Sequence, residues 1–301
     1  SSTVGTGSFT TPCVAADAPF TEGIESGYAD QTGVGGCWSQ LSTGGGNAWT
    51  ANSSMTTYNR QARTGAFNAY LQYGNTDWLF HPINLNAGTV YRFTAYARQE
   101  GATAAYASLT LAYGTDPTEA GMVNTEVNAQ GLVNGDYQVV EGDFSPATTG
   151  MYYIGIKGMI TSAPWYISLD DISVVSVEVC SGTPDPGATT GPASVCPGVA
   201  FMLGIEDQST YAGISYQWEV SSNGTIWAAA PGNSTAATYS TSQTVTTWYR
   251  LEMTCDGGGT AYSTPLQVTL KGPTECYCTT SFSTVEPICN VTFSDINHDS
   301  A

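Results

Sequence analysis

The chain has 301 residues, of which 25 are acidic and 7 basic, so its formal net charge is −18. A surface of that sign repels phosphates, and we expect no nucleic acid and no anionic membrane among its partners. A hydrophobic content of 41% indicates a folded protein. No apolar run is long enough to span a bilayer, so we expect no membrane insertion.

The first part of the chain has the pattern of a β-sandwich. Gly, Thr, Ser, Tyr and Val are plentiful and Leu and Lys are scarce, which favours strands and turns over helices. Between Phe9 and Glu178, alternating apolar segments are broken by Gly, Asn, Asp and Pro, as in TVYRFTAYARQ, ASLTLAYG, YQVVEGDF and MYYIGIKG. This spacing predicts an all-β jelly-roll sandwich over residues 1–179.

A second domain follows a stretch rich in proline and glycine, SGTPDPGATTGPAS, which breaks any regular element and marks a boundary. Strand patterns resume in VAFMLGI, ISYQWEVS, TWYRLEMTC and TPLQVTL. The order Cys196, Trp218, Cys255 is that of an immunoglobulin-type sandwich, in which a tryptophan packs over a bridge between the sheets. We predict an Ig-like β-sandwich over residues 180–276.

Residues 277–301 form a tail that is too short to fold alone. In ICNVTFSDI, Cys289, Val291 and Phe293 fall on one face and polar residues on the other, so a period of two predicts a half-buried extended strand. We expect its partner to lie outside the tail, on the same molecule or on a neighbouring one by strand addition. A head-to-tail contact of the second kind that does not close generates a filament.

Cysteine content indicates the compartment. The chain has eight cysteines without a repeated metal-ligand spacing, and it has only two histidines, which favours disulfides over zinc. Because disulfides form in oxidising compartments, we expect a secreted protein, extracellular or at the cell surface. The sequence starts at Ser1 without a basic or apolar leader, and we expect any signal peptide to have been removed or to lie outside it.

Several stretches carry a resemblance to a known group of proteins. PFTEGIESG, Cys37-Trp38, DWLFHPINLNAGTVYRFTAYAR, FSPATTGMYYIGI and WYISLDDISV together resemble the MAM-like jelly-roll domains of multidomain secreted surface proteins of Gram-negative bacteria. SVCPGVAF, YQWEVSSNGTIW, TWYRLEMTC and ECYC are similar to the Ig/PKD-like module that often follows there. The tail is similar to the first strand of the GEVED-type β-domain, which usually continues further. Either the chain is a fragment, or this strand pairs elsewhere.

The cysteine pairing cannot be deduced from the sequence alone. Proximity along the chain and the resemblance imply the four disulfides Cys13–Cys37, Cys180–Cys276, Cys196–Cys255 and Cys278–Cys289. The final Asp299-Ser300-Ala301 resembles an O-glycosylation motif of exported proteins of the same bacterial group, with Ser300 as the acceptor.

A structural calcium ion is expected in the first domain. Glu25 lies near its first strand, and the pair Asp170-Asp171 lies near its last, where hard oxygen ligands suit Ca²⁺. The resembled family often carries a structural calcium there, with Glu25 and Asp171 as the matching ligands. The alternative is that both carboxylates are solvated or accept hydrogen bonds from turn amides.

We do not expect an enzyme. A serine or cysteine nucleophile needs a neighbouring histidine, and the two histidines are His81, next to a proline, and His298, near the C-terminus. Two carboxylates among Glu22, Glu25 and the Asp170-Asp171 pair would suffice for a retaining glycosidase, yet the sequence shows no dedicated cleft.

Aromatic residues allow a binding function instead. Some jelly rolls of the resembled kind stack sugars on aromatic side chains, and Trp38, Trp49, Trp78 and Trp165 are the candidates in the first domain. Core packing is the default for side chains of this size.

Two functions remain. Our main prediction is a secreted structural subunit of an extracellular bacterial filament, a homopolymer joined head to tail by the strand with Cys289, Val291 and Phe293. The alternative is a carbohydrate-binding adhesin module of a larger surface protein, with glycans as partners. A third possibility, the accessory region of a surface enzyme, would need a catalytic domain that these residues do not contain.

Overall fold

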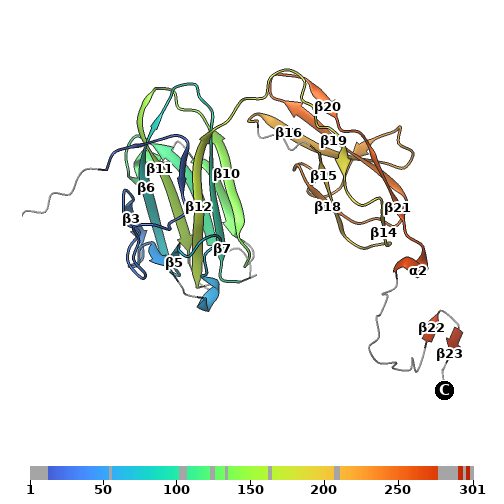
Figure 1. Ribbon diagram of the computed structural model, residues 1–301, viewed down its shortest axis with the longest axis horizontal. Helices are drawn as coiled ribbons and strands as arrows, with labels where there is room; N and C mark the ends of the chain where they lie inside the picture. The colour runs from blue at the N-terminus through green and yellow to red at the C-terminus, as the bar shows by residue number, and fades with distance from the viewer. Residues whose placement is uncertain are drawn as a thin grey trace, which may run out of the picture. The chain divides into compact units, whose positions relative to one another are not determined.

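The computed structural model describes residues 13–53, 56–101, 107–122, 126–132, 135–161, 165–206, 211–276, 291–293 and 296–298. The chain divides into two compact units, Ser1–Val179 with Thr210–Ala212 and Cys180–Ser209 with Gly213–Ala301 (Figure 1). Most ordered segments are strands, and the described helices are single turns: η1 (Thr57–Asn59), α1 (Glu119–Met122) and α2 (Pro273–Cys276). The all-β prediction is confirmed. None of these helices has the length and apolar character that crossing a membrane requires.

The first unit is built from two six-stranded sheets (Figure 1). One sheet has the order β1-β6-β11-β8-β9, with β3 beside β6: β1 (Ala16–Asp17), β3 (Ser39–Gly44), β6 (Asn75–Leu85), β8 (Ala107–Gly114), β9 (Glu126–Leu132) and β11 (Gly150–Ile160). The other has the order β10-β7-β12-β5-β4, with β2 beside β12: β2 (Phe20–Glu22), β4 (Thr50–Asn52), β5 (Asn68–Gln72), β7 (Tyr91–Gln99), β10 (Gln138–Phe144) and β12 (Tyr166–Ser176). Of these pairings, only that of β1 with β6 is parallel.

The core of the first unit lies between the inner faces of the two sheets. Along the first seven residues of β7 the buried side chains are Tyr91, Phe93, Ala95 and Ala97, and the residues between them are partly exposed. This is the period of two that the sequence shows. The largest fully buried side chains of the unit include Trp49 and Phe93. Burial of a large apolar side chain contributes about 1.5–3 kcal/mol to stability. The core therefore stabilises the two sheets, which in turn hold the exposed side chains in place.

The pair Asp170-Asp171 interrupts the apolar alternation of β12 because the strand bulges there. Its register against β7 shifts between Asp170 and Ser173, and Asp171 has a φ of 45°. Before the bulge β12 pairs with β5, and after it with β2. The bulge therefore moves the strand from one neighbour to the next and turns both carboxylates toward the same loop.

The second unit also contains two sheets. The smaller has the order β13-β15-β18: β13 (Thr189–Thr190), β15 (Phe201–Ile205) and β18 (Tyr239–Thr241). The larger has the order β14-β21-β19-β16-β17, with β20 beside β19: β14 (Ser194–Val195), β16 (Ile214–Ser221), β17 (Ala228–Ala229), β19 (Thr247–Cys255), β20 (Thr260–Tyr262) and β21 (Leu266–Leu270). Trp218 is fully buried between them and stacks on Tyr239, so it is a core residue, as the sequence predicts.

Two of the expected disulfide pairings are wrong. The second unit joins Cys180 to Cys255 and Cys196 to Cys276, each with a Cα–Cα distance of 5.5 Å. The expected pairs were Cys180–Cys276 and Cys196–Cys255. The Cys13–Cys37 bridge of the first unit is present.

The cause of the exchange is a parallel strand pair. Val195 of β14 pairs with Leu270 of β21, so Cys196 emerges beside the chain that leads into α2 and Cys276. Cys255 is the last residue of β19. Shortly after it, the N–H of Gly259 donates to the carbonyl of Gly182, which brings Cys255 next to Cys180.

The tail strand has a different partner from the expected one. Its backbone, β22 (Val291–Phe293), pairs antiparallel with β23 (Ile296–His298) a few residues on. A partner outside the tail, which would have to pair with the other edge of β22, stays a prediction. The expected Cys278–Cys289 bridge and the acceptor Ser300 lie outside the described residues, as do the side chains of Val291 and Phe293.

Candidate functional site

Three exposed aromatic side chains of the first unit lie on or beside the ends of two neighbouring strands. Up to residue 179, the described aromatic side chains that are largely exposed are Tyr58 (49%), Tyr73 (41%) and Trp165 (45%). Tyr73 follows β5 and Trp165 precedes β12, which pairs with β5. Tyr58 lies in η1 and contacts Tyr166, the first residue of β12, with the ring centroids 5.4 Å apart and the ring planes tilted by 33°. We call Tyr58, Tyr70, Tyr73, Trp165 and Tyr166 the aromatic surface.

The part of this surface formed by Tyr73 and Trp165 is fixed by backbone hydrogen bonds. The N–H of Tyr73 donates to the carbonyl of Trp165 at 2.7 Å, and the two rings meet edge to face with centroids 4.6 Å apart. The N–H of Trp165 donates to Oε2 of Glu100 at 2.7 Å. Both rings thus project from strand ends whose positions the sheet determines.

The other part surrounds an arginine. Tyr70 on β5 and Tyr166 on β12 approach to 5.6 Å between ring centroids. The guanidinium carbon of Arg60 lies 4.5 Å from the Tyr70 centroid and 4.2 Å from that of Tyr166. The hydroxyl of Tyr70 donates to Oε1 of Gln31 at 2.9 Å. Arg60 lies two residues after Tyr58 in the chain. Its cation–π contacts therefore attach the segment with Tyr58 to the rings of two neighbouring strands.

Tyr58 is held out by a strained turn. Tyr58 and Asn59 both have positive φ angles, 61° and 53°. Each such residue costs on the order of 1–3 kcal/mol, a strain that persists only where the surroundings enforce it and that is frequent at ligand sites. Here Nδ2 of Asn59 donates to the carbonyl of Gly135 at 2.6 Å, across the top of the sheet.

Three of the four tryptophans considered for sugar stacking are core residues instead. Trp38, Trp49 and Trp78 are 7%, 0% and 3% exposed, so the prediction that they present a platform is wrong. Only Trp165 reaches solvent. The tyrosines that accompany it come from separate segments, and single-sequence periodicity gave no signal for them.

The carboxylates of Glu25 and Asp171 bind the same loop. Glu25 accepts hydrogen bonds from the N–H groups of residues 66 and 67 at 2.9 and 3.1 Å. The oxygens of Asp171 accept from Nη1 of Arg63 at 2.6 Å and from the hydroxyl of Thr64 at 2.7 Å. For Glu25 this is the alternative that the sequence left open, hydrogen bonding to turn amides.

These side chains, as they lie, do not fit a calcium ion. The positive charge beside Asp171 is the guanidinium of Arg63, and both of its carboxylate oxygens are engaged. Within the described ranges, no three His, Cys, Asp or Glu side chains are placed to hold a metal ion. The calcium site of Glu25 and Asp171 stays a prediction.

Asp170 completes the attachment of the loop from beneath. Its side chain is fully buried and accepts from the N–H groups of Arg63 at 2.7 Å and Asp171 at 2.8 Å. Burial outweighs these hydrogen bonds and raises the pKa of Asp170 to about 6. The loop behind Arg60 is thus anchored by three carboxylates.

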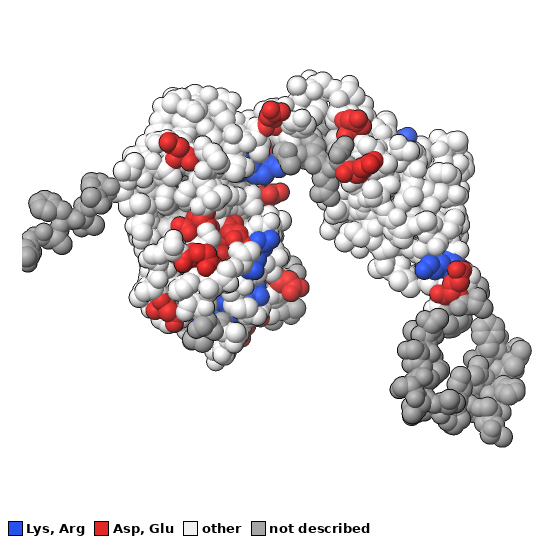
Figure 2. All heavy atoms as spheres, viewed as in Figure 1, with Lys and Arg blue, Asp and Glu red and all other residues white. Residues whose placement is uncertain are grey.

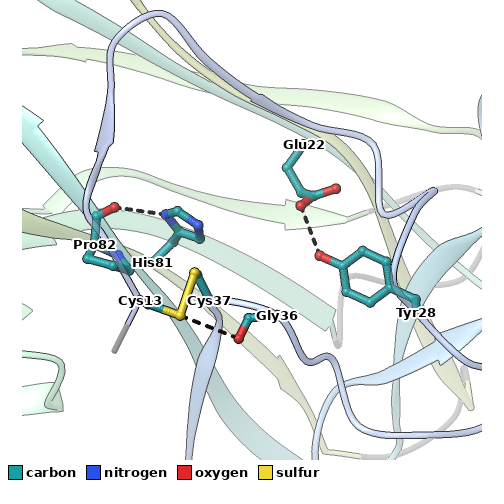
Figure 3. The surroundings of a disulfide bond; sticks show 7 residues. All are labelled: Cys13, Glu22, Tyr28, Gly36, Cys37, His81 and Pro82. Atoms are coloured by element: carbon teal, nitrogen blue, oxygen red, sulfur yellow. Dashed lines mark hydrogen bonds between the residues drawn. A yellow bond between two sulfur atoms is a disulfide. The ribbon is translucent and has the colours of Figure 1, made fainter. Parts of the chain in front are cut away.

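The residues considered for catalysis have structural roles. His81 is 7% exposed, and its Nδ1 lies 2.9 Å from the carbonyl of Pro82 (Figure 3). Burial lowers the pKa of His81. Glu22 accepts from the hydroxyl of Tyr28 at 2.9 Å, which Figure 3 also shows. The absence of catalysis stays a prediction.

Comparisons with known proteins give one family match and several similar solved structures. The family model of a domain of unknown function (DUF8696) matches residues 176–272. No curated protein is significantly similar to the chain in sequence.

Among solved structures, the K1 cleaved adhesin domain of Lys-gingipain from Porphyromonas gingivalis W83 is 13% identical, covers 52% of this chain and 97% of its own, and gives a TM-score of 0.40. The K2 adhesin domain of Lys-gingipain is 19% identical, covers 52% and 98%, and gives 0.41. The CBM22-1 xylan-binding domain of Xyn10C from Paenibacillus barcinonensis is 13% identical, covers 56% and 100%, and gives 0.36. Likeness at this level carries no argument about function, and the resemblance to MAM-like, Ig/PKD-like and GEVED-type domains stays a prediction.

Proposed function

We propose that the chain is a secreted binding module whose first unit, a jelly roll, recognises carbohydrate through the aromatic surface. The observation that carries the proposal is the exposed pair Tyr73 and Trp165, whose rings meet edge to face at the ends of β5 and β12, with Tyr58 exposed beside Tyr166, the residue that follows Trp165. Sugar rings have apolar C–H faces, and exposed aromatic rings are the side chains that cover such faces with a large, rigid contact area. The adhesin alternative drawn from the sequence therefore becomes the preferred function.

Polar groups at the margin of the surface suit sugar hydroxyls. Nδ2 of Asn47 donates to Oε1 of Gln72 at 3.0 Å, and the amide of Gln31 receives the hydroxyl of Tyr70. In such sites apolar contact provides most of the binding, and a small number of precisely placed polar groups determines the orientation of the ligand. Planar amides beside aromatic rings can have this role.

An extracellular location is supported by the disulfides. All six cysteines that the structure describes are bonded in pairs. Bridges of this kind persist in oxidising compartments. An Ig-like second unit would then serve as a spacer or as a further contact surface on the outside of the cell.

The proposal is tested by affinity electrophoresis of the full chain in gels that contain soluble polysaccharides, followed by calorimetric titration with those that retard it. Trp165→Ala and Tyr73→Ala should each weaken binding about 10- to 100-fold, since each removes a large apolar contact. The matched control is Met151→Ala, which truncates a side chain that is 53% exposed on β11 of the other sheet. Equal affinity of the three variants and the wild type would contradict the proposal.

The filament stays a prediction. The argument from the sequence was that the tail strand lacks a partner, and the described backbone of β22 has one in β23. Assembly through Cys289, Val291 and Phe293 is therefore the second function to test, and deletion of the tail tests it.

A further inference from the structure

Two arginines of the first unit are buried without a carboxylate partner. Arg60 is 5% exposed and Arg98 is 8% exposed, and neither forms an ion pair with a carboxylate in the part of the chain that the structure describes. The other arginines each have one at 2.6 to 2.8 Å: Arg63 with Asp171, Arg92 with Asp143 and Arg250 with Glu219. Uncompensated cations in a chain of net charge −18 need a physical reason.

Both guanidinium groups touch the segment that carries Tyr58. Nε of Arg60 donates to the carbonyl of Thr57 at 3.3 Å, and its other N–H groups have no hydrogen bond to a described residue. Nη2 of Arg98, on the neighbouring strand β7, donates to the carbonyl of Gln61 at 2.5 Å. Nε of Arg98 is buried without a partner among the described residues. Two positive charges thus lie beside and beneath one edge of the aromatic surface.

Tyrosine rings lie against both cations. The charges of Asp136 and Asp170 also act on Arg98, which leaves Arg60 as the cation whose contacts with described residues are with rings and a backbone carbonyl. Arg60 lies among Tyr58, Tyr70 and Tyr166, and Arg98 lies 4.4 Å from the ring centroid of Tyr137. Ring faces attract a cation but do not neutralise it. A buried charge without a counter-charge destabilises the fold unless something else supplies that counter-charge.

We infer that the glycan bound by the aromatic surface carries an anionic group, a uronate carboxylate or a sulfate ester, that pairs with Arg60. The inference rests on the proposed function and names its ligand class. Arg60 makes the direct contact because its guanidinium lies among the rings on which the sugar stacks, and its Nη groups have the two parallel donors that a planar carboxylate or a sulfate accepts. Arg98 adds positive potential beneath the same segment.

Acidic groups oppose these charges: Asp136 and Asp170 act on Arg98, and Glu100 lies near Arg60. Glu100 accepts a hydrogen bond from the N–H of Trp165. Burial raises the pKa of the Tyr166 hydroxyl, and Glu100 lies close enough to raise it further, whereas Arg60 lowers it. Asp171, the other acid beside the loop, is neutralised by Arg63. The local potential at the aromatic surface therefore depends mainly on the balance of Arg60 against Glu100, because Arg98 has Asp136 and Asp170 as opposing charges. In Figure 2 the basic side chains seen on the first unit lie toward one side of it, among acidic ones.

The experiment compares ligands that differ only in charge. The full chain is titrated calorimetrically with polygalacturonate and with the same polymer after methyl esterification, and in a second arm with dextran sulfate and dextran. The first pair tests a carboxylate and the second a sulfate ester. At low salt one charged polymer should bind about 10- to 100-fold more tightly than its neutral partner, the range expected for hydrogen bonds to a charged group. The preference should shrink as salt is added.

Variants assign the effect to Arg60. Arg60→Gln should abolish the preference, and Arg60→Lys should restore part of it. Glu100→Gln should increase the preference, because it removes the opposing charge and keeps an acceptor for the N–H of Trp165. The matched control is Arg92→Gln, since Arg92 on the same sheet is paired with Asp143. If Arg60→Gln unfolds the first unit, the wild type and Glu100→Gln decide the matter.

Equal affinity for charged and neutral polymers overturns the inference. If Trp165→Ala weakens both equally in that case, the proposed function stands and its ligand is neutral. If none of the four polymers binds, the inference and the proposed function both fail.

Discussion

The Cys180–Cys255 bridge gives a sharp test of the second unit, because it joins residues 75 apart in sequence. In the chain-entropy account, closing a loop of that size in the unfolded state contributes about 4.5 kcal/mol. The Cys196–Cys276 bridge already shortens the path along the unfolded chain from Cys180 to Cys255. This lowers the expected contribution of the Cys180–Cys255 bridge to about 4 kcal/mol. Replacing both cysteines by serine should therefore remove about 4 kcal/mol from a domain whose total stability is ~5–15 kcal/mol.

Two measurements check this reasoning. Peptide mapping without reductant should recover a fragment in which the Cys180 peptide is linked to the Cys255 peptide. Guanidinium denaturation of the double variant, Cys180→Ser with Cys255→Ser, should show a lower midpoint for the transition of the second unit and an unchanged one for the first. Recovery of the Cys180 peptide linked to that of Cys276 would refute the described pairing, as would a double variant as stable as the wild type.

Three further predictions concern pH, calcium and the tail. Because the folded pKa of His81 lies below its usual 6.5, the stability that its neutral form provides is present above pH 6.5 and is lost as the pH falls from 6.5 through the lower folded pKa. Asp170, with its pKa raised to about 6, has the opposite effect, and stabilises the fold as the pH falls from 6 to 4. The melting temperature of His81→Asn should therefore fall less on acidification than that of the wild type. An equal fall in both proteins would show that His81 does not contribute to the pH dependence. If Glu25 and Asp171 share a calcium ion, addition of a chelator should lower the melting temperature of the first unit alone. An unchanged melting temperature would exclude the ion and leave Arg63 as the counter-charge of Asp171. If the tail polymerises the chain, removal of residues 279–301 should leave folded monomers, and filaments of unchanged repeat in electron micrographs would exclude the tail as the linker.

Much of the fold could be predicted because it depends on local alternation. The strands β7, β8, β10 and β11 coincide with the segments in which apolar residues recur every second position. Trp218 was recognisable as a core residue from its place between two cysteines. The pair Asp170-Asp171 was visible as a break in the pattern, and the structure explains that break as a bulge.

Other features depend on contacts between distant segments and left no local signal. The disulfide pairing follows from the parallel pairing of β14 with β21, which brings Cys196 to Cys276 and has no counterpart in the order of the cysteines. The aromatic surface combines a strained turn at Tyr58 with the ends of two strands. Tryptophan content alone pointed to four residues, and burial removed three of them because a large ring contributes most to stability inside the core.

The most direct test of the central claim is a crystal structure of the chain with the polysaccharide fragment that binds it most tightly. The account predicts a sugar ring stacked on Trp165, Tyr73 or Tyr58, within van der Waals contact of the ring face and beside Arg60. A fragment bound on the β1-β6-β11-β8-β9 sheet, or on the second unit, with the aromatic surface empty, would contradict it.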